Sequence, residues 1–210
     1  MILPEMQAAT LSIPRAMFSI EDPWELPDGV APVLLRRATD GALPHLATSV
    51  AVWWDERYLN TLFAGDDDAV IASYFEHDAP LWQEDVVEIF AAPQAPTRYF
   101  EIEVNPLGTL FDALIDSPDG VRATMRTDLG WNCDGLFAAT RRTAHHFSTI
   151  IRVPFEPLGG APVRGDRWRG NFFRVDRHPA RGDEFSAWQP AMKVPADFHV
   201  VAAFGEWLFA

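Results

Sequence analysis

The sequence has little cysteine, little helical periodicity and no long apolar run. Its 210 residues include a single cysteine, Cys133, so no internal disulfide can form and redox compartment is not fixed by this residue. No apolar run approaches the ~18 residues that a membrane-spanning helix needs. The first twenty residues also lack the basic segment followed by an apolar segment that marks a signal peptide. A cytoplasmic protein is therefore the simple expectation, with a secreted protein expected instead if a leader has been trimmed away.

Enzyme signatures are missing too. There is no glycine-rich phosphate loop, no G-x-S-x-G and no H-E-x-x-H. Only His145 and His146 are close together among the histidines, and neighbours on a strand point to opposite faces, so surface histidines are favoured over a metal site. Glu101 and Glu103 could be read as a glycosidase pair, but acids two apart on a strand lie side by side and cannot flank a bond. A solvated face is the favoured interpretation, and we expect no catalytic residues.

The formal charge of −13 disfavours two classes of partner, nucleic acid and anionic membrane. It is compatible with neutral ligands and with cations such as calcium. The run 64–70 (AGDDDAV) offers clustered carboxylates, yet it lacks the alternating spacing of a calcium loop. We therefore predict no cofactor and no specific metal ligands, and a structural calcium ion stays open.

What the sequence does contain is a series of short segments with period-two alternation, bounded by Pro, Gly, Asp or Asn. These segments predict strands at 47–54, 57–64, 85–91, 98–104, 109–115, 135–141, 147–153, 168–175 and 204–209. The tetrapeptide 105–108 (NPLG) predicts a tight hairpin, and 66–74 could hold one helical turn. Nine evenly spaced strands indicate an all-β fold, an antiparallel two-sheet β-sandwich of immunoglobulin-like or jelly-roll-like type. We expect a single domain over 1–210, in which 1–45 form an N-terminal extension and the first strands.

Tryptophan is abundant, with eight in the chain, and most should be core. Trp54 and Trp207 end or lie within apolar strands and are predicted to be buried. Trp82 and Trp188 differ, because each lies in a proline-bounded, loop-like segment, "APLWQED" and "FSAWQPAM". Exposed aromatic rings on rigid loops stack on the apolar faces of ligands such as sugars.

A carboxylate in the middle of a short apolar strand is the second unusual feature. Alternation places Glu88 on one face of its strand and Glu101, Glu103 and Asn105 together on one face of the next. If the two strands pair, these groups line a polar concavity that could bind hydroxyl groups. The alternative, about equally favoured, is that Glu88 is a buried acid satisfied by an arginine or by backbone amides.

Several segments resemble a known family in their order and spacing. They are "LWQEDVVEIF", "YFEIEVNPLGTLFDA", "IIRVPFEPLG", "WRGNFFRVD" and "SAWQP" followed by "FHVVAAFGEWLF". From about Ala47 to the C-terminus the chain is similar to carbohydrate-binding module family 9-like domains, of the DOMON-like β-sandwich superfamily. The resemblance implies a two-sheet sandwich that is non-catalytic and that binds the reducing end of a glycan between two tryptophans.

Carried over to this chain, the resemblance implies a sugar site of four residues. Trp82 and Trp188 would enclose the ring, while Glu88 and Asn105 would bind its hydroxyl groups. The sugar-binding members have a basic residue where this chain has Glu103, which is a departure in the same site. The implied partner is a xylan- or cellulose-derived oligosaccharide or a monosaccharide.

Two residues of "WRGNFFRVD", Asn171 and Arg174, lie on a late strand that could face the same cleft, and they complete the predicted ligand-binding set. Three alternatives to sugar binding stay open. A haem or redox domain would need axial ligands, for which Met125, His146 and Met192 are the candidates. A glycoside hydrolase would need two of the acids, and a domain that has lost its ligand site would serve as a partner surface.

Overall fold

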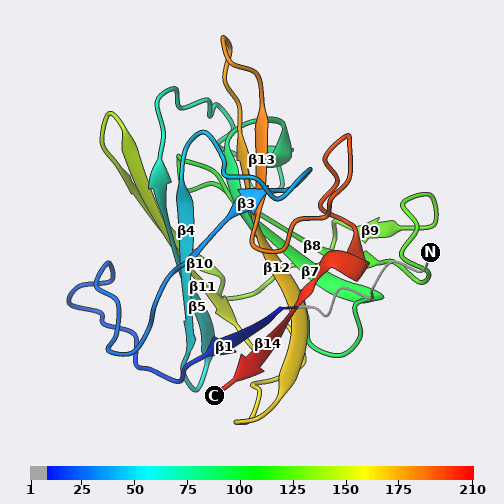
Figure 1. The fold of residues 1–210 in the computed structure, drawn as a ribbon. Helices are drawn as coiled ribbons and strands as arrows, with labels where there is room; N and C mark the ends of the chain where they lie inside the picture. The colour runs from blue at the N-terminus through cyan, green and yellow to red at the C-terminus, as the bar shows by residue number, and fades with distance from the viewer. Residues whose placement is uncertain (1–8) are drawn as a thin grey trace.

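Two β-sheets face each other in the computed structural model, which describes residues 9–210 (Figure 1). Residues 1–8, part of the predicted N-terminal extension, lie outside the described residues. The first sheet has nine strands and the second has five. This arrangement confirms the predicted all-β, two-sheet sandwich.

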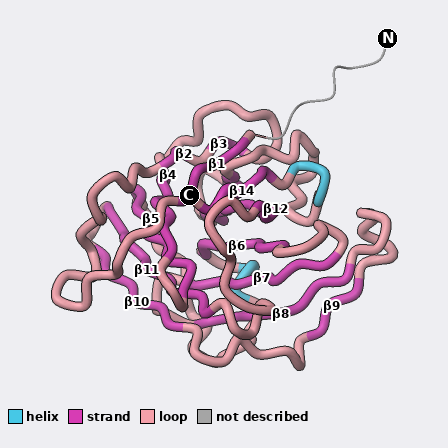
Figure 2. The backbone as a smooth tube through the Cα atoms, turned by 90° about the horizontal axis from the view of Figure 1, so that it is seen from below, coloured by secondary structure: helices cyan, strands magenta, loops and turns pink. Residues whose placement is uncertain are grey.

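The nine-stranded sheet runs in the order β1-β14-β12-β6-β7-β8-β9, with β13 and β3 continuing beside β12. Its strands are β1 (Thr10–Ile13), β3 (Arg36–Arg37), β6 (Val86–Ala92), β7 (Arg98–Val104), β8 (Leu110–Asp116), β9 (Arg126–Asp128), β12 (Arg167–Asp176), β13 (Glu184–Ala187) and β14 (Gly205–Phe209). All of its pairs are antiparallel except β1 with β14, which is parallel. Figure 2 shows β6, β7, β8 and β9 following one another across this sheet.

The five-stranded sheet runs in the order β10-β11-β5-β4-β2. Its strands are β2 (Val33–Leu34), β4 (Thr48–Trp54), β5 (Tyr58–Asp66), β10 (Phe137–Arg142) and β11 (His146–Pro154). Two 3-10 helices, η1 (Leu81–Gln83) and η2 (Val201–Ala203), are the only helices within residues 9–210. Neither could cross a bilayer, and no longer helix is found in that range.

The main core lies between the sheets and follows the predicted alternation. On β6 the residues Val87, Ile89 and Ala91 point into it, and Phe172 and Trp207 stack there with ring centroids 4.7 Å apart. The alternate residues of the same strands point to the outer face of the nine-stranded sheet, which is therefore available for a site.

All nine predicted strands are present, with ends that shift by one or two residues. The predicted hairpin is confirmed, because the amide of Gly108 donates to the carbonyl of Asn105 and Gly108 has a φ of +83°. The helical turn predicted within 66–74 is wrong, since this segment leaves β5 as an extended loop. Five short strands had no predicted range. Three of them, β1, β2 and β3, lie within 1–45, where the first strands were expected, and the other two are β9 and β13.

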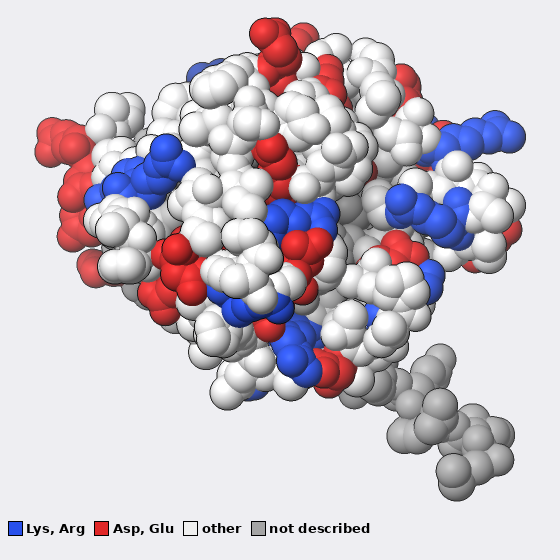
Figure 3. Space-filling view, turned by 90° about the horizontal axis from the view of Figure 1, so that it is seen from above, with Lys and Arg blue, Asp and Glu red and all other residues white. Residues whose placement is uncertain are grey.

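Charges of both signs are mixed over the surface despite the net charge of −13. Figure 3 shows acidic and basic side chains next to one another on the face seen from above. Many of them are paired, as in Arg181 with Asp68 and Arg177 with Asp183.

Candidate functional site

A cavity of about 370 Å³ lies on the outer face of the nine-stranded sheet. That volume is within the range of small-molecule sites. Its floor is formed by β6, β7, β8 and β12, and its walls come from η1, the segment 122–129 and the segment 196–199. Its lining includes Trp82, Glu88, Glu101, Glu103, Phe111 and Phe198.

Strand register brings the carboxylates of the floor together. β6 and β7 pair antiparallel with Glu88 opposite Glu103, and Phe111 on β8 lies on the other side of Glu103. Glu101 is two residues before Glu103 and therefore points to the same face. One carboxylate oxygen from each of the three glutamates lies within 4.8 Å of the other two. We refer to Glu88, Glu101 and Glu103 as the glutamate cluster.

The glutamate cluster is buried, which corrects the expectation of a solvated face. Glu103 is 0% exposed, and Glu88 and Glu101 are 2% and 6% exposed. Neither carboxylate oxygen of Glu103 has a hydrogen-bond partner. Among residues 9–210, no arginine or lysine forms an ion pair with any member of the cluster. The alternative that Glu88 is satisfied by an arginine is therefore not what the structure contains.

Burial without a cationic partner favours the protonated acids. Burial, reinforced by neighbouring carboxylates, raises the pKa of Glu88 and of Glu103 well above the ordinary value. Burial also raises the pKa of Glu101 to about 7. The cluster therefore holds protons near neutral pH, and a neutral carboxyl group can donate a hydrogen bond to its neighbour.

This has a consequence for stability, because the folded pKa of Glu101 exceeds the unfolded one. A group of this kind stabilises the fold below its unfolded pKa, and the contribution is lost as pH rises through about 7. For Glu101 the loss in the free energy of unfolding between pH 5 and pH 9 is on the order of 3 kcal/mol. We expect Glu101→Gln to remove part of this pH dependence, because glutamine does not ionise. Denaturant unfolding at both pH values measures it, with the exposed Glu156→Gln as control. Parallel pH profiles for wild type and Glu101→Gln would contradict this expectation.

Trp82 is held at the edge of the cavity by contacts to two strands. Its ring is 42% exposed and packs edge-on against Phe111 of β8, with centroids 5.3 Å apart. Its backbone carbonyl accepts a hydrogen bond of 2.6 Å from the guanidinium of Arg177, just after β12. Phe198 lines the cavity as well and stacks on Phe173 at 4.2 Å. The cavity thus joins aromatic rings with buried carboxylates.

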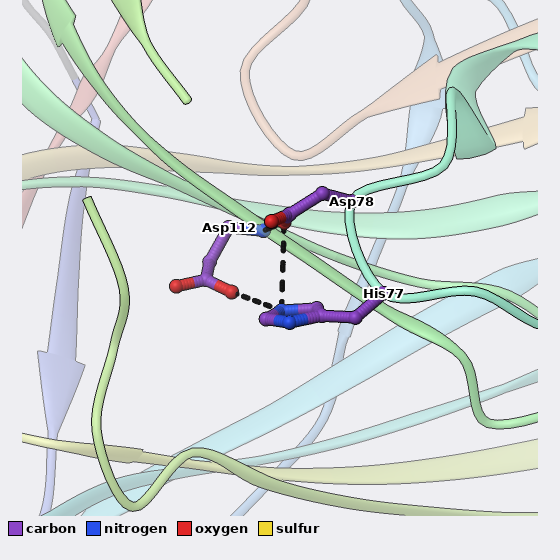
Figure 4. A group of neighbouring side chains, drawn as sticks. All are labelled: His77, Asp78 and Asp112. Atoms are coloured by element: carbon purple, nitrogen blue, oxygen red, sulfur yellow. Dashed lines mark hydrogen bonds and ion pairs between the residues drawn. The ribbon is translucent and has the colours of Figure 1, made fainter. Parts of the chain in front are cut away.

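A second group of polar side chains, His77, Asp78 and Asp112, lies at the segment that leads to Trp82 (Figure 4). His77 Nε2 lies 2.5 Å from the buried carboxylate of Asp112 on β8 and 3.5 Å from that of Asp78. The amide of Asp78 donates to the carbonyl of Leu110. The three side chains are close enough to hold a metal ion. The contact between His77 and Asp112 also provides a structural role, which is to attach residues 77–78 to β8 just before η1.

Of the seven predicted ligand-binding residues, the structure brings Trp82, Glu88 and Glu103 together in the cavity. Asn105 is 1% exposed and does not line it. Its side-chain oxygen accepts from the amides of Leu107 and Thr109, and so it holds the hairpin turn. Sequence alternation places Asn105 on the face of Glu103, but the chain turns at this position.

Asn171 is also structural. It is fully buried, and its side chain forms two hydrogen bonds with the backbone of Gln189, at 2.8 and 2.9 Å. It therefore fixes the beginning of the segment that later supplies Phe198, without lining the cavity itself.

Arg174 faces the opposite way from the cavity and connects the two sheets. Its guanidinium donates to the Thr48 hydroxyl at 2.8 Å and to the Asp66 carbonyl at 2.7 Å, both in the five-stranded sheet. It also pairs with Asp67 and Asp176, and all three side chains are at most 5% exposed. The expectation that Arg174 reaches the ligand cleft is corrected, because residues of β12 alternate and this one points between the sheets.

Trp188 also lies away from the cavity, contrary to the prediction. The ring is 8% exposed, belongs to the main core and lies 6.2 Å from Phe172. It does not line the cavity with Trp82. Its local sequence resembles that of an exposed loop. The ring instead fills the space beside Gly205, which is free because glycine has no side chain.

Several cavity residues on loops were not predicted as ligand-binding residues, among them Arg122, Arg177, Phe198 and His199. His199 has its Nδ1 2.6 Å from the Tyr99 hydroxyl, and burial lowers its pKa to about 3, so the ring is neutral. Phe111 could have been found, because alternation on β8 places it on the face of Glu103. The loop residues have no periodic pattern in the sequence, so the sequence did not predict that they line the cavity.

The residues named for other functions are dispersed. Of the three haem-ligand candidates, Met125 lines the cavity, whereas His146 is on β11 of the other sheet and Met192 is exposed. The acidic run considered for calcium is divided among three partners, because Asp66 contacts His146, Asp67 contacts Arg174 and Asp68 contacts Arg181. Burial raises the pKa of the Cys133 thiol to about 12, so the thiol stays protonated.

One protein family is shown by comparison with known proteins. The family model described as carbohydrate-binding family 9 matches residues 43–209. An extracellular protein from Arthroderma benhamiae is 24% identical over 183 residues, which cover 79% of this chain and 80% of the relative.

Solved structures share the fold at low identity. A crystal structure of a Bacteroides uniformis protein covers 97% of this chain and all of its own, with a TM-score of 0.75 and 18% identity. A family 9 module from Caldicellulosiruptor kristjanssonii in complex with cellotriose has a TM-score of 0.64 and 15% identity, covering 95% of this chain and 93% of its own. The same kind of module in complex with glucose has a TM-score of 0.63 at 15% identity, with coverages of 96% and 95%.

Proposed function

Because the chain belongs to carbohydrate-binding family 9, we propose that its cavity binds a saccharide without catalysing a reaction on it. The observation that carries this proposal is the half-exposed Trp82 ring beside the glutamate cluster. Aromatic faces pack against the apolar C–H faces of a pyranose, while carboxylates accept hydrogen bonds from its hydroxyl groups. One cavity offers both kinds of surface.

Trp82 would supply the stacking surface, because Phe111 and Arg177 hold its ring and its backbone in place. Glu88 would accept hydroxyl hydrogen bonds from the floor. Phe198 takes the place of the second aromatic wall in this proposal, since Trp188 is in the core. A rigid site of this kind loses little side-chain entropy on binding.

The arrangement of the acids supports binding rather than hydrolysis. A glycosidase needs two carboxyl groups on either side of the scissile bond, with enough room between them for the substrate. In the glutamate cluster all three carboxyl groups come from one sheet face and lie within 4.8 Å of one another. A sugar ring would rest on all of them from the same side.

Glucose and cello-oligosaccharides are the first ligands to test, because two structures of similar fold hold glucose and cellotriose. An affinity in the micromolar to millimolar range, about −4 to −8 kcal/mol, is expected for a site with few stacking contacts. Since the Arthroderma benhamiae relative is an extracellular protein, we include an extracellular setting in the proposal.

Trp82→Ala is expected to weaken saccharide binding by about tenfold or more, because it removes the exposed aromatic surface. Isothermal titration with glucose, cellobiose and cellotriose measures the change. Trp24→Ala is the matched control, since Trp24 is half-buried against the outer side of the five-stranded sheet. Equal affinities for wild type and Trp82→Ala would refute the proposed site.

A further inference from the structure

Resting on the proposed saccharide function, we propose that the bound saccharide is an amino sugar whose protonated amine is bound by Glu88, Glu101 and Glu103. The glutamate cluster is an unusual floor for a neutral ligand. Buried carboxylates are normally paired with a cation or fully hydrogen-bonded. Here neither oxygen of Glu103 has a hydrogen bond of ordinary geometry, its nearest polar groups being the Trp82 amide and the Glu101 carboxyl, and no cation pairs with this fully buried side chain.

The two arginines that line the cavity form their ion pairs with other acids, so their charges only partly offset the rise in the pKa of Glu88 and Glu101. Arg177 donates to Asp183 at 2.5 Å and to the carbonyl of Trp82 at 2.6 Å. Arg122 lies 3.5 Å from Asp197. The remaining ionisable neighbour, His199, lies 4.0 Å from Glu101 and is neutral, because burial lowers its pKa to about 3. A charge from the ligand is therefore the missing partner of the glutamate cluster.

The geometry suits an ammonium group. A protonated primary amine has three N–H donors in a tetrahedral arrangement, and it bonds carboxylate oxygens at about 2.8 Å. Three acceptors around one such nitrogen lie about 4.6 Å apart, as follows from that bond length and the tetrahedral angle. The cluster offers one oxygen from each of three carboxylates, none more than 4.8 Å from the other two, so the three are close enough together to bond a single nitrogen.

The walls favour an organic cation over a bare metal ion. Calcium takes six to eight oxygen ligands. Around the glutamate cluster the cavity presents the rings of Trp82, Phe111 and Phe198 instead. These rings offer packing to the carbon skeleton of a sugar and cation–π attraction to an attached ammonium group. An amino sugar has the positive charge that would pair with the glutamate cluster. It also has an apolar carbon skeleton that can pack against the aromatic rings of the cavity.

Binding a cation in this place must also move protons. The unliganded cluster holds protons near neutral pH, because burial raises the pKa of all three glutamates. An ammonium group stabilises their ionised forms, so the protons of the cluster leave to the buffer on binding. A neutral sugar has no charge with which to displace them.

The test compares three sugars that differ at one position. Glucosamine carries the charge, N-acetylglucosamine has the nitrogen without the charge, and glucose has a hydroxyl group. Isothermal titration of each at pH 7, in phosphate and in HEPES buffer, neither of which carries a primary amine, gives the affinity and the number of protons released. We expect glucosamine to bind about tenfold or more tightly than the two neutral sugars. Only its binding heat should depend on the buffer.

Two variants test whether the glutamate cluster causes the preference for glucosamine. Glu103→Gln removes one ionisable group at nearly constant shape and is expected to abolish most of the preference for glucosamine over glucose, measured as the ratio of the two affinities in the same variant. Glu88→Gln provides the same test independently, should one variant not fold. The exposed Glu156→Gln is the control and should behave as wild type.

The outcomes separate this inference from the proposed function. Equal binding of glucose and glucosamine, with Trp82→Ala abolishing both, overturns the amino-sugar inference and leaves the saccharide site intact. A glucosamine preference that persists in Glu103→Gln and Glu88→Gln also overturns it. Calcium binding that Glu103→Gln abolishes, without a preference for glucosamine, would assign the cluster to a metal ion instead. If none of the three sugars binds, the amino-sugar inference and the proposed saccharide function are both refuted.

Discussion

Arg174→Met is expected to lower the free energy of unfolding by about 3–5 kcal/mol, the usual result of removing one partner from a buried ion pair. The guanidinium of Arg174 is the point at which β12 holds the loop end of the other sheet, through Thr48, Asp66 and Asp67. Methionine keeps the length of the apolar stem. The loss therefore comes from the Asp67 carboxylate, which is 5% exposed and would have no cation beside it.

Urea unfolding at pH 7 measures the change. Arg98→Met is the matched control, because Arg98 is 65% exposed and lies 3.8 Å from Asp116, a surface pair that contributes little. Adding Asp67→Asn to Arg174→Met should restore part of the stability, since it removes the uncompensated charge. A loss below about 1 kcal/mol for Arg174→Met would show that the inter-sheet ion pair is not important for stability.

Gly205→Ala is expected to destabilise the fold by about 3 kcal/mol or more, at the upper end of the effect of overpacking. Gly205 begins β14 and pairs with Gly170 on β12. A β-carbon at position 205 would lie 2.2 Å from Cζ3 and 2.3 Å from Cη2 of Trp188. The ring cannot move away easily, because it is packed in the main core.

Thermal and denaturant unfolding of Gly205→Ala test this expectation. Gly130→Ala is the control, since Gly130 is exposed and a β-carbon there would meet only the end of the flexible Asp128 side chain, at 3.3 Å. Combining Gly205→Ala with Trp188→Phe should recover part of the loss, because the smaller ring leaves room. An unchanged melting temperature for Gly205→Ala would mean that Trp188 is not confined as described.

Long strands could be predicted from the sequence because alternation is a local property. The strands that were missed have two to four residues, and several of them depend on distant partners. β1, for example, pairs with β14 at the other end of the described chain, and β3 pairs with β13. A short stretch of sequence does not show which distant segment it will pair with.

The candidate site was also predictable only where it depends on local alternation. Glu88 and Glu103 were predicted to share a face, and the β6–β7 register places them opposite each other. Trp188 was placed in the site because its proline-bounded context resembles an exposed loop. Whether such a ring points in or out is decided by the space beside Gly205, which is 17 residues away in the sequence. Phe198 and His199 enter the cavity from a loop, and their positions depend on the packing of that loop against Phe173, Tyr99 and Phe90.

The parallel pairing of β1 with β14 has a consequence for the rate of folding. Thr10 lies opposite Glu206, 196 residues later, so this pair closes a very long loop. Pairings between such distant segments form late, because the loop entropy is lost before the contacts compensate for it. Until β1 is in place, β14 has an open edge. An open strand edge is a template for another chain, so the refolding yield should depend on protein concentration through the period in which β1 is still unpaired.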